Sequence, residues 1–454
     1  MTDGEVLSRT QALCPVCLRR LPAVRARRGD AVWLERECPE HGPFSAVIWR
    51  GGPDFSTWRR DKTPSAPPVA ATAVDRGCPY DCGLCPDHGQ HTCTAVVEVT
   101  QRCGLGCPVC YASAGATTAP DPAAADLALR LARLRRDAGP CNVQLSGGEP
   151  TTRDDLPEII RAAREQRFGL VQLNTNGLRL ADEPGYAQSL AEAGLQSVFL
   201  QFDGPDDACL ALRGQRLAAR KLAALDACAE AGLGVVLVPT LVRGVNDGAL
   251  GDIVRLAIAR MPTVRGVHFQ PASTFGRFPG ALSEAQRLTL PEVLTLLVEQ
   301  SLGMLRVEDF HPPCCEHERC SFSGRFILAQ GRLSPLADAG SCCGDTPLSL
   351  QPAAPPSAAE GARRAKNSVA GQWASAPAMP KAPPRDDFER FLAARGADKR
   401  LSISCMAFQD AHTLELDRVR GCCIHTQTAD GRLIPFCLYN LTAQDDSTLY
   451  RGRI

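Results

Sequence analysis

Three closely spaced cysteines after a short apolar run constrain the fold of this chain more than any other feature. They are Cys103, Cys107 and Cys110, in the spacing C-x3-C-x2-C, and the run before them reads AVVEVT. Three thiolates on one loop can hold three corners of a [4Fe-4S] cluster and leave the fourth iron open to a ligand. The alternatives are a zinc knuckle or buried free thiols, but a loop directly after an apolar strand favours the cluster.

Composition excludes some function classes and narrows the cellular setting. The chain has 454 residues, which predicts a main domain with appended modules, and its 50 acidic and 50 basic residues cancel. A net charge of zero gives no reason to expect a nucleic-acid partner. The start, MTDGEVLSRT, has no apolar export segment, and no apolar run is long enough to span a membrane. We therefore expect a cytoplasmic protein whose 22 cysteines bind metals rather than form disulfides.

From residue 94 to about 280, short apolar runs alternate with amphipathic helical stretches. The runs cover residues 94–99, 142–145, 170–174, 197–202, 234–239 and 266–270, with segments such as DLPEIIRAAREQ between them. Alternating strands and helices joined by short loops form parallel β/α units. Six units predict an α/β fold, a partial (β/α)6 TIM-type barrel whose site lies at the carboxyl ends of the strands.

Polar and glycine-containing motifs fall at five of these strand ends. SGGEPT follows the second strand, NTNG the third, QFDG the fourth, VPT the fifth and HFQPAS the sixth. Each motif alone is an ordinary turn sequence, but five at consecutive strand ends predict one cofactor site. The two glycines of GGEP allow close backbone approach to a ligand, and its glutamate offers a carboxylate to an ammonium group. The candidate cofactor-binding residues are Gly147, Gly148, Glu149, Pro150, Asn174, Asn176, Asp203, Pro239 and Gln270.

Residues 1–60 read as a small metal-stapled module of the zinc-ribbon or rubredoxin type. Cys14 and Cys17 form one knuckle, and Cys38 and His41 form the second. Together they predict a tetrahedral site for zinc or a single iron, although a later cysteine in place of His41 is an alternative. A module this short has little core, so the metal would supply much of its folding free energy.

The segment 72–93 repeats the first cysteine spacing and adds a fourth thiol. Its cysteines are Cys78, Cys82, Cys85 and Cys93. Four thiolates can bind all four irons of a cluster, which suits electron transfer or structure, and we expect an auxiliary [4Fe-4S] cluster here. A second loop of the first kind is the alternative, but no strand precedes this segment.

Beyond the barrel, composition divides the chain into three further parts. Residues 281–350 read as a helical and cysteine-rich extension, residues 351–385 as an Ala/Pro-rich linker without a packed core, and residues 386–454 as a cysteine-rich cluster module with a hairpin at Asp430. Nine cysteines follow residue 313, and one member of each adjacent pair is expected to be a bystander. The candidate ligands among them are Cys315, Cys320, Cys405, Cys422 and Cys437. Elsewhere, Cys141, Cys209 and Cys228 stand alone in apolar contexts and are expected in the core.

The order of these motifs resembles the radical S-adenosylmethionine (SAM) superfamily and, within it, the family of the archaeal tetraether lipid synthase and its bacterial relatives. The motifs CPxC, CPEHG, CxxxCPxC, SGGEPT, NTNG, FLQFDG, LVPTLVRGVND, HFQPAS and RVRGCCIH carry the resemblance over nearly the whole chain. The resemblance implies SAM on the open iron of the first cluster, with its amino group at the GGEP loop. It further implies one or two auxiliary [4Fe-4S] clusters, a mononuclear iron or zinc, and a low-potential electron donor of the flavodoxin or ferredoxin type.

The cluster loop departs from the superfamily pattern in one respect. Many members place an aromatic residue before the third cysteine to cover the adenine, whereas this chain has Val109 there and Tyr111 after the cluster. We therefore take Tyr111 as the candidate adenine contact. Arg213 and Lys221, on the helix after the fourth strand, either reach the SAM carboxylate or lie on a solvated face.

Three functions follow from these features. The resemblance implies hydrogen abstraction from unactivated C–H bonds, leading to coupling or modification of lipid alkyl chains, with an apolar lipid or small-molecule substrate and possible peripheral contact with the inner face of the membrane. The alternative is a radical SAM methyltransferase acting on a pterin-like heterocycle, which predicts S-adenosylhomocysteine as co-product and a compact polar pocket. A non-catalytic Fe-S electron-transfer or sensing protein is the third, but it would not need GGEPT and NTNG beside the cluster loop.

Overall fold

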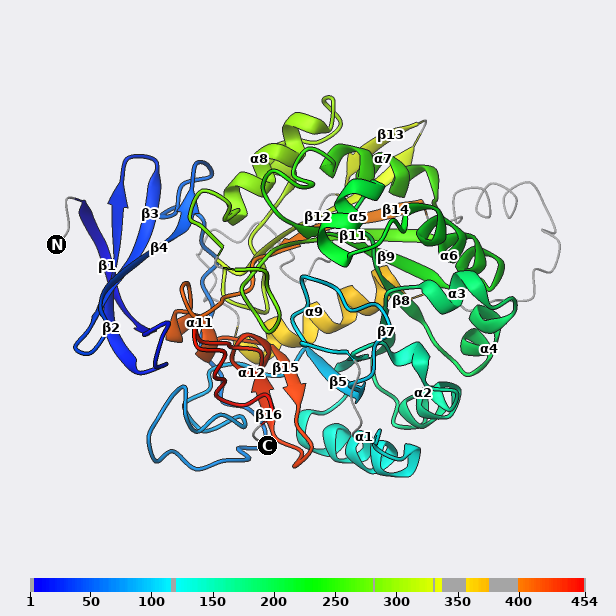
Figure 1. Ribbon diagram of the computed structural model, residues 1–454, viewed down its shortest axis with the longest axis horizontal. Coiled ribbons are helices and arrows are strands. Elements are labelled where there is room, and N and C mark those ends of the chain that lie inside the picture. Colours follow the sequence, from blue (N-terminus) through cyan, green and yellow to red (C-terminus); the bar gives the residue numbers. More distant parts are fainter. Residues whose placement is uncertain are drawn as a thin grey trace, which may run out of the picture.

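The computed structural model describes residues 4–115, 120–280, 282–329, 331–336, 357–374 and 399–452. Its larger part is a curved sheet with helices packed outside it, and its smaller part is an antiparallel ribbon at the N-terminus (Figure 1). Cys342 and Cys343, which the sequence placed in the cysteine-rich extension, lie outside the described residues.

Six parallel strands form the centre of the large sheet, as the apolar runs predicted. They are β5 (Thr94–Thr100), β6 (Asn142–Gly147), β7 (Leu170–Thr175), β8 (Ser197–Gln201), β9 (Gly234–Val238) and β11 (Val264–Pro271), paired in that order. The short β10 (Thr240–Leu241) pairs with β11. The predicted partial barrel is therefore confirmed.

Helices cover the outer face of these strands (Figure 1). They are α1 (Ala124–Ala138), α2 (Leu156–Glu165), α3 (Leu178–Asp182), α4 (Tyr186–Glu192), α5 (Asp206–Arg213), α6 (Ala218–Glu230) and α7 (Leu250–Ala259). In α2, Leu156, Ile159, Ile160 and Ala163 recur at helical spacing and are all buried, so its apolar stripe faces the sheet. Burial raises the pKa of Cys141 and Cys228 to about 12, in keeping with their expected place in the core.

The C-terminal part of the chain extends the barrel sheet at both edges. Strand β14 (Arg400–Met406) pairs in parallel with β11, and β15 (Ile424–Gln427) pairs in parallel with β5. Beyond β14 lie the antiparallel β12 (Ser321–Ala329) and β13 (Arg332–Pro335), and beyond β15 lies β16 (Leu433–Pro435). The extension 281–350, expected to be helical and cysteine-rich, contains one such helix, α8 (Leu290–Gln300), but its residues 321–335 form a strand pair. The hairpin at Asp430 is confirmed.

The expectation of a linker without a packed core at 351–385 is wrong for its described part. Residues Ala358–Trp373 form helix α9, which contacts β9, β11 and β14. Ala358, Gly361 and Ala362 are buried, and a Cβ added at Gly361 would overlap the carbonyl oxygen of Cys314. Alanine-rich composition suits a helix as well as a linker, and close packing of small residues decides between them here.

The N-terminal ribbon is a four-stranded antiparallel sheet. Its strands are β1 (Glu5–Leu13), β2 (Arg20–Arg28), β3 (Ala31–Cys38) and β4 (Gly42–Arg50). Buried Arg25 pairs with Glu415 and Asp417 at the start of α11 (Leu416–Arg420), and Arg50 pairs with Glu292 of α8 (Leu290–Gln300) at 2.8 Å. These ion pairs fix the ribbon to the C-terminal part of the chain.

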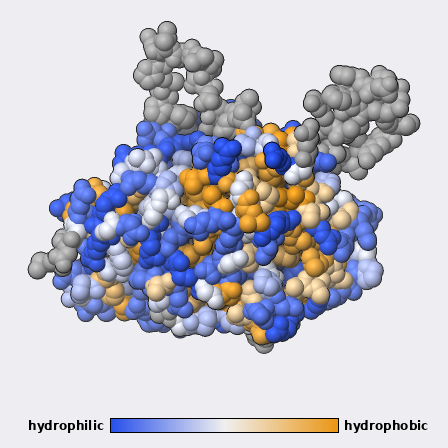
Figure 2. Space-filling model, turned by 90° about the horizontal axis from the view of Figure 1, so that it is seen from above, coloured by the Kyte–Doolittle hydropathy of each residue, from blue (hydrophilic) through white to orange (hydrophobic). Residues whose placement is uncertain are grey.

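No helix in the described part of the chain is long and apolar enough to cross a membrane. The face of the molecule in Figure 2 shows hydrophobic residues gathered near its middle, surrounded by hydrophilic ones.

Candidate active site and metal centres

A cavity of about 830 Å³ occupies the interior of the barrel. Cys103, Cys107 and Cys110 line one part of it, next to the carboxyl end of β5. Cys93, Cys315 and Cys423 line another part, and Cys93 immediately precedes β5. The cavity therefore connects two cysteine groups at opposite ends of the barrel strands.

The loop that carries Cys103, Cys107 and Cys110 is held by two buried or half-buried arginines. Arg277 donates to the carbonyl oxygen of Cys107 at 2.7 Å, and Arg213 donates to that of Val109 at 2.9 Å. Three thiols on one loop that open on a cavity suit a site-differentiated [4Fe-4S] cluster, which they would hold with one iron facing the cavity.

The two glycines of GGEP are required by the approach of one strand end to the next. A Cβ added at Gly147 would overlap the carbonyl oxygen of Thr100, and one at Gly148 would overlap that of Arg102. Their neighbours bond the same segment, since the Gly148 amide donates to Thr100 at 2.8 Å and the Glu149 amide to Arg102 at 2.8 Å. The sequence attributed these glycines to ligand approach, but contact with the segment before the cluster loop already requires them.

Glu149 ties the ends of β6 and β7 together beside the cavity. One carboxylate oxygen accepts from the Thr151 hydroxyl and the Thr175 hydroxyl, each at 2.7 Å, and the other accepts from the Asn176 amide at 2.7 Å. Glu149 is buried and still lines the cavity, so its charge is fixed in position near the cluster loop.

Most of the predicted cofactor-binding residues face the cavity, and three do not. Those lining it are Gly147, Gly148, Glu149, Asn174, Asn176, Gln270 and Tyr111; Pro150, Asp203 and Pro239 are not among its lining residues. Asp203 is 1% exposed, and both its oxygens are taken by Arg213, at 2.7 and 2.9 Å. We correct its expected role: Asp203 positions Arg213, which in turn holds the cluster loop.

Arg213 and Lys221 are buried, so the solvated-face interpretation is wrong for both. Lys221 donates to the carbonyl oxygen of Asn176 and to the side chain of Gln201, the latter at 3.1 Å. Burial lowers its pKa to about 8. Lys221 thus links the ends of β7 and β8.

Tyr111 lies against the cavity wall, as expected of a residue beside the cluster loop. Its hydroxyl is 2.9 Å from that of Ser146, and its ring packs on Phe436. Burial raises the pKa of this phenol to about 12, so it stays protonated at neutral pH.

Polar side chains point inward from the barrel strands, where apolar layers usually fill a barrel of this type. Asn174 donates to Gln144 at 3.3 Å, Gln144 donates to Gln172 at 2.9 Å, and Gln172 donates to Ser197 at 3.0 Å. Within the described part of the chain, both polar side-chain atoms of Asn142 and the carbonyl oxygen of the Asn174 side chain are buried without a partner. A buried amide without a partner indicates a missing ligand or water.

The sequence motifs identified Asn174 and Gln270 but not Asn142, Gln144 or Gln172 of this polar interior. The sequence of the strands could have predicted it. The polar residues of NVQLSG, LVQLNT and VHFQP are two residues apart, so their side chains lie on one face of the sheet.

The second cysteine group corrects the predicted ligand set of segment 72–93. The sulfur atoms of Cys93, Cys315 and Cys423 all lie within 4.8 Å of one another. The first two are joined as a disulfide, which departs from the expectation that the cysteines bind metals rather than form disulfides, and these thiols would hold a cluster only with that bond reduced. Cys93 was expected with Cys78, Cys82 and Cys85 instead. The parallel pairing of β5 with β15 places Cys93 beside Cys423, and the Cys93 amide donates to the Cys423 carbonyl at 2.8 Å. Of the adjacent pair 422–423, the structure therefore places Cys423 in this group.

The other candidate ligands divide into two sets and one core residue. Cys78, Cys82 and Cys85 lie close together. Cys320, Cys422 and Cys437 also lie close together. Arg418 donates two hydrogen bonds of 3.4 Å to the sulfur of Cys320. Cys405, by contrast, is fully buried within the hydrophobic core on β14, which argues against the ligand role expected for it.

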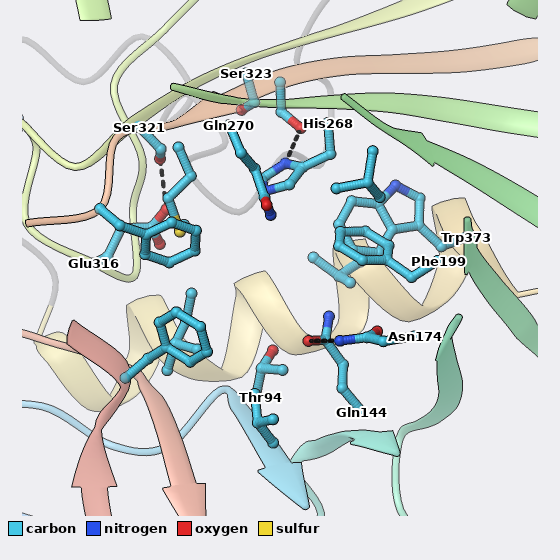
Figure 3. Close-up of a pocket in the computed structure, with 18 of the residues that line it drawn as sticks. Thr94, Gln144, Asn174, Phe199, His268, Gln270, Glu316, Ser321, Ser323 and Trp373 are labelled. Atoms are coloured by element: carbon cyan, nitrogen blue, oxygen red, sulfur yellow. Dashed lines mark hydrogen bonds between the residues drawn. The ribbon is translucent and has the colours of Figure 1, made fainter. Parts of the chain in front are cut away.

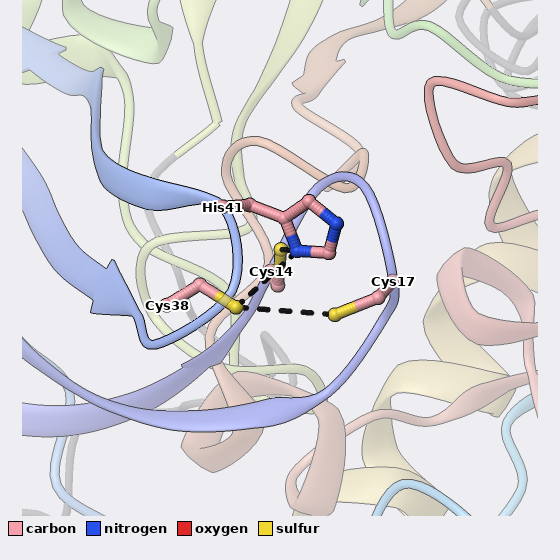
Figure 4. A group of neighbouring side chains, drawn as sticks. All are labelled: Cys14, Cys17, Cys38 and His41. Atoms are coloured by element: carbon pink, nitrogen blue, oxygen red, sulfur yellow. Dashed lines mark hydrogen bonds between the residues drawn. The ribbon is translucent and has the colours of Figure 1, made fainter.

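The ribbon brings its four predicted ligands together (Figure 4). The sulfur atoms of Cys14, Cys17 and Cys38 and a ring nitrogen of His41 all lie within 4.8 Å of one another. The His41 Nδ1 is 3.7 Å from the sulfur of Cys14 and 3.5 Å from that of Cys38. Three thiols and one imidazole at this spacing suit a tetrahedral structural zinc.

Two family models match the chain. Residues 97–257 match the radical SAM superfamily, and residues 6–50 match the HMPTM N-terminal zinc ribbon domain. Radical SAM proteins use SAM and a [4Fe-4S] cluster, so these are cofactors of this chain, and the remaining cysteine groups and the ribbon fit auxiliary metal sites.

Similarity to known proteins narrows the family to which the chain belongs. It is 34% identical over 477 aligned residues to 7,8-dihydro-6-hydroxymethylpterin dimethyltransferase of Methanocaldococcus jannaschii, covering 95% of this chain and 93% of that protein. It is 30% identical to the mitochondrial GTP 3',8-cyclase of Arabidopsis thaliana over 48% of this chain and 54% of that protein. The crystal structure of Streptococcus suis SuiB aligns with a TM-score of 0.38 and 16% identity over 46% of this chain and 45% of that one. The match to the pterin dimethyltransferase does not support the narrower resemblance to the tetraether lipid synthase. The chain belongs to the radical SAM superfamily and, within it, to the family of the Methanocaldococcus jannaschii pterin dimethyltransferase.

Proposed function

We propose that the protein is a radical SAM methyltransferase that acts on a pterin-like heterocycle. The observation that carries the proposal is the amide-lined cavity between the two cysteine groups. The relative from Methanocaldococcus jannaschii is named for methylation of a hydroxymethylpterin, which gives the substrate class.

The chemistry of the cavity wall favours a heterocycle over an alkyl chain. A pterin ring presents hydrogen-bond donors and acceptors around its edge, which can pair with the side chains of Asn142, Gln144 and Asn174. An alkyl chain in the same place would leave the Asn142 amide and the carbonyl oxygen of the Asn174 side chain without partners, at a cost of about 1–3 kcal/mol for each buried group.

The residues of the chain have separable tasks in this reaction. Cys103, Cys107 and Cys110 would hold the cluster, which with SAM supplies one-electron chemistry and hydrogen abstraction from a C–H bond. Arg213 and Arg277 hold the loop in position, and Glu149 presents a fixed carboxylate to the SAM ammonium group. The electron enters from a low-potential donor of the flavodoxin or ferredoxin type.

One observation favours a second candidate, the modification of lipid alkyl chains. The cavity reaches both ends of β5, which is about 20 Å long, so an extended chain would fit along it. The polar lining argues against this candidate, and the same experiment separates the two.

The test is anaerobic reconstitution with iron, sulfide, SAM and a low-potential reductant, in parallel with 7,8-dihydro-6-hydroxymethylpterin and with a lipid extract. We expect 5'-deoxyadenosine and S-adenosylhomocysteine together with a methylated pterin. Formation of a coupled lipid and no methylated pterin would support the second candidate, and the absence of 5'-deoxyadenosine from both would contradict a radical mechanism. The Cys103→Ala variant is the matched control for background SAM breakdown.

A further inference from the structure

Three aromatic side chains form one end wall of the cavity, which we call the aromatic wall: Phe199 of β8, His268 of β11 and Trp373 of α9. The ring of Phe199 lies 5.5 Å from that of His268 and 5.6 Å from that of Trp373, and the rings of His268 and Trp373 are 6.2 Å apart. Figure 3 shows Trp373 and Phe199 together at one end of the cavity. Aromatic rings at these separations pack favourably, and because they are tilted by 42 to 67° from one another, a ligand ring would stack on the face of one of them rather than on all three.

The position of Trp373 is built into two neighbouring strands. A Cβ added at Gly234, the first residue of β9, would lie 2.9 Å from the Trp373 carbonyl oxygen, and one at Gly266 of β11 would lie 3.2 Å from the Trp373 Nε1. The same Nε1 donates to the hydroxyl of Ser402 on β14 at 2.8 Å. The end of α9 therefore packs closely against β9, β11 and β14.

His268 completes the aromatic wall as a neutral ring. Its Nδ1 is 2.8 Å from the hydroxyl of Ser404, and burial lowers its pKa to about 4. The wall therefore carries no charge at neutral pH and suits a neutral flat ring.

Amides face each other across the space beside the aromatic wall. In Figure 3, Gln270 points into the cavity from one side and Gln144 from the opposite side, with Asn174 next to Gln144. The Gln270 side chain has no hydrogen-bond partner among the described residues, and the carbonyl oxygen of the Asn174 side chain is buried without one. This leaves the Gln270 amide on one side of the cavity and the Asn174 carbonyl oxygen on the other without protein partners among the described residues.

We infer that the substrate ring stacks on the aromatic wall, that Gln144, Asn174 and Gln270 pair with its edge, and that Trp373 is a specificity-determining residue. The inference rests on the proposed function and goes further, because it assigns recognition to α9 and to the polar interior. It also places the ring toward the amino ends of the barrel strands, since Trp373 lies by Gly234, the first residue of β9, and by Ser402, the third residue of β14.

Substitution of Trp373 tests the stacking. We would measure binding of 7,8-dihydro-6-hydroxymethylpterin to the anaerobically reconstituted enzyme by equilibrium dialysis. The Trp373→Leu variant should bind about fivefold more weakly and Trp373→Phe within about twofold of the wild type, because phenylalanine keeps an aromatic face. Asn367→Ala, an exposed position on the same helix, should bind as the wild type does.

A second pair of variants covers the case in which Trp373→Leu does not fold. Phe199→Leu removes the neighbouring ring on β8, and Gln270→Leu removes an amide that has no protein partner to lose among the described residues. Both should weaken binding of the pterin to the reconstituted enzyme.

The outcomes separate the two proposals. A wild-type enzyme that does not bind the pterin would contradict the proposed function. A wild-type enzyme that binds it, with Trp373→Leu, Phe199→Leu and Gln270→Leu binding equally well, would contradict the recognition inference alone. Weaker binding in Trp373→Leu that Trp373→Phe restores would support it.

Discussion

Cys93 and Cys103 stand at opposite ends of strand β5 and line the same cavity. The strand has 7 residues, so its ends lie about 20 Å apart. The SAM-binding cluster and the group containing Cys93 therefore border the substrate cavity at opposite ends of β5. A molecule in the barrel interior is accessible to both, and electrons passing from one site to the other would cross that space or its wall.

The cysteine grouping predicts which variants share a defect. Cys93→Ala and Cys423→Ala should lose the same auxiliary cluster, about four irons, because both thiols belong to one site. Cys78→Ala should lose the electron paramagnetic resonance signal of a different cluster. Iron analysis and electron paramagnetic resonance of the reduced proteins would compare them.

Cys422→Ala is the matched control for this comparison, since it changes the adjacent residue. It should retain the signal that Cys423→Ala loses. If Cys93→Ala matched Cys78→Ala and differed from Cys423→Ala, the ligand set expected from the sequence would be correct and the grouping in the structure wrong.

This difference shows where sequence patterns stop being informative. The six barrel strands and the glycine motifs were predictable because strand alternation and turn chemistry are local. The partner of Cys93 was not, because it depends on the pairing of Thr94 with Ile424, residues far apart in the chain. The same applies to Trp373: its role depends on space left by Gly234 and Gly266, whereas the Ala/Pro composition around it suggested a linker.

Loss of a cysteine from the loop at 103–110 should abolish SAM cleavage. In Cys107→Ala the cluster would have only two thiolates from this loop, so 5'-deoxyadenosine formation should fall to background. Cys228→Ala, a cysteine buried in the core on α6, should retain iron and activity with at most a loss of stability. SAM cleavage by Cys107→Ala at the wild-type rate would show that the cluster is held elsewhere.

Metal binding to the ribbon should govern folding of residues 5–50. Cys38→Ala should lose about one zinc and expose the ribbon to proteases, since the metal supplies most of the folding free energy of so small a module. Metal analysis and limited proteolysis would detect both changes. His41→Cys should retain the metal because a thiolate replaces the imidazole.

Glu37→Ala, an exposed position next to Cys38, is the control and should change neither property. Full zinc content in Cys38→Ala would contradict the assignment of this residue as a ligand.

The buried pair of Asp410 and Arg287 should make stability depend on pH. Arg287 donates to the Asp410 carboxylate at 2.9 Å, and the Thr274 hydroxyl, on the loop after β11, donates to it at 3.0 Å. Burial alone would raise the pKa of Asp410, but Arg287, His412 and the hydrogen bonds outweigh it and hold the pKa well below its usual range. A carboxyl group whose pKa is lower in the folded than in the unfolded state stabilises the fold at pH values above the unfolded-state pKa, which is about 3.9. This contribution is lost as the pH falls from there toward the folded-state pKa.

Asp410→Asn should therefore lower the free energy of unfolding at pH 7 by about 3–5 kcal/mol, because it leaves the Arg287 charge buried without its partner. The difference between variant and wild type should shrink as the pH falls below about 4, because the Asp410 carboxylate of the unfolded wild type is protonated there while that of the folded protein is still ionised. Denaturant unfolding of the anaerobic holoprotein across this pH range measures both effects. Asp207→Asn, whose side chain is 86% exposed, should change the free energy by less than about 0.5 kcal/mol. A constant difference between Asp410→Asn and wild type at all pH values would show that the charge of Asp410 does not stabilise the fold.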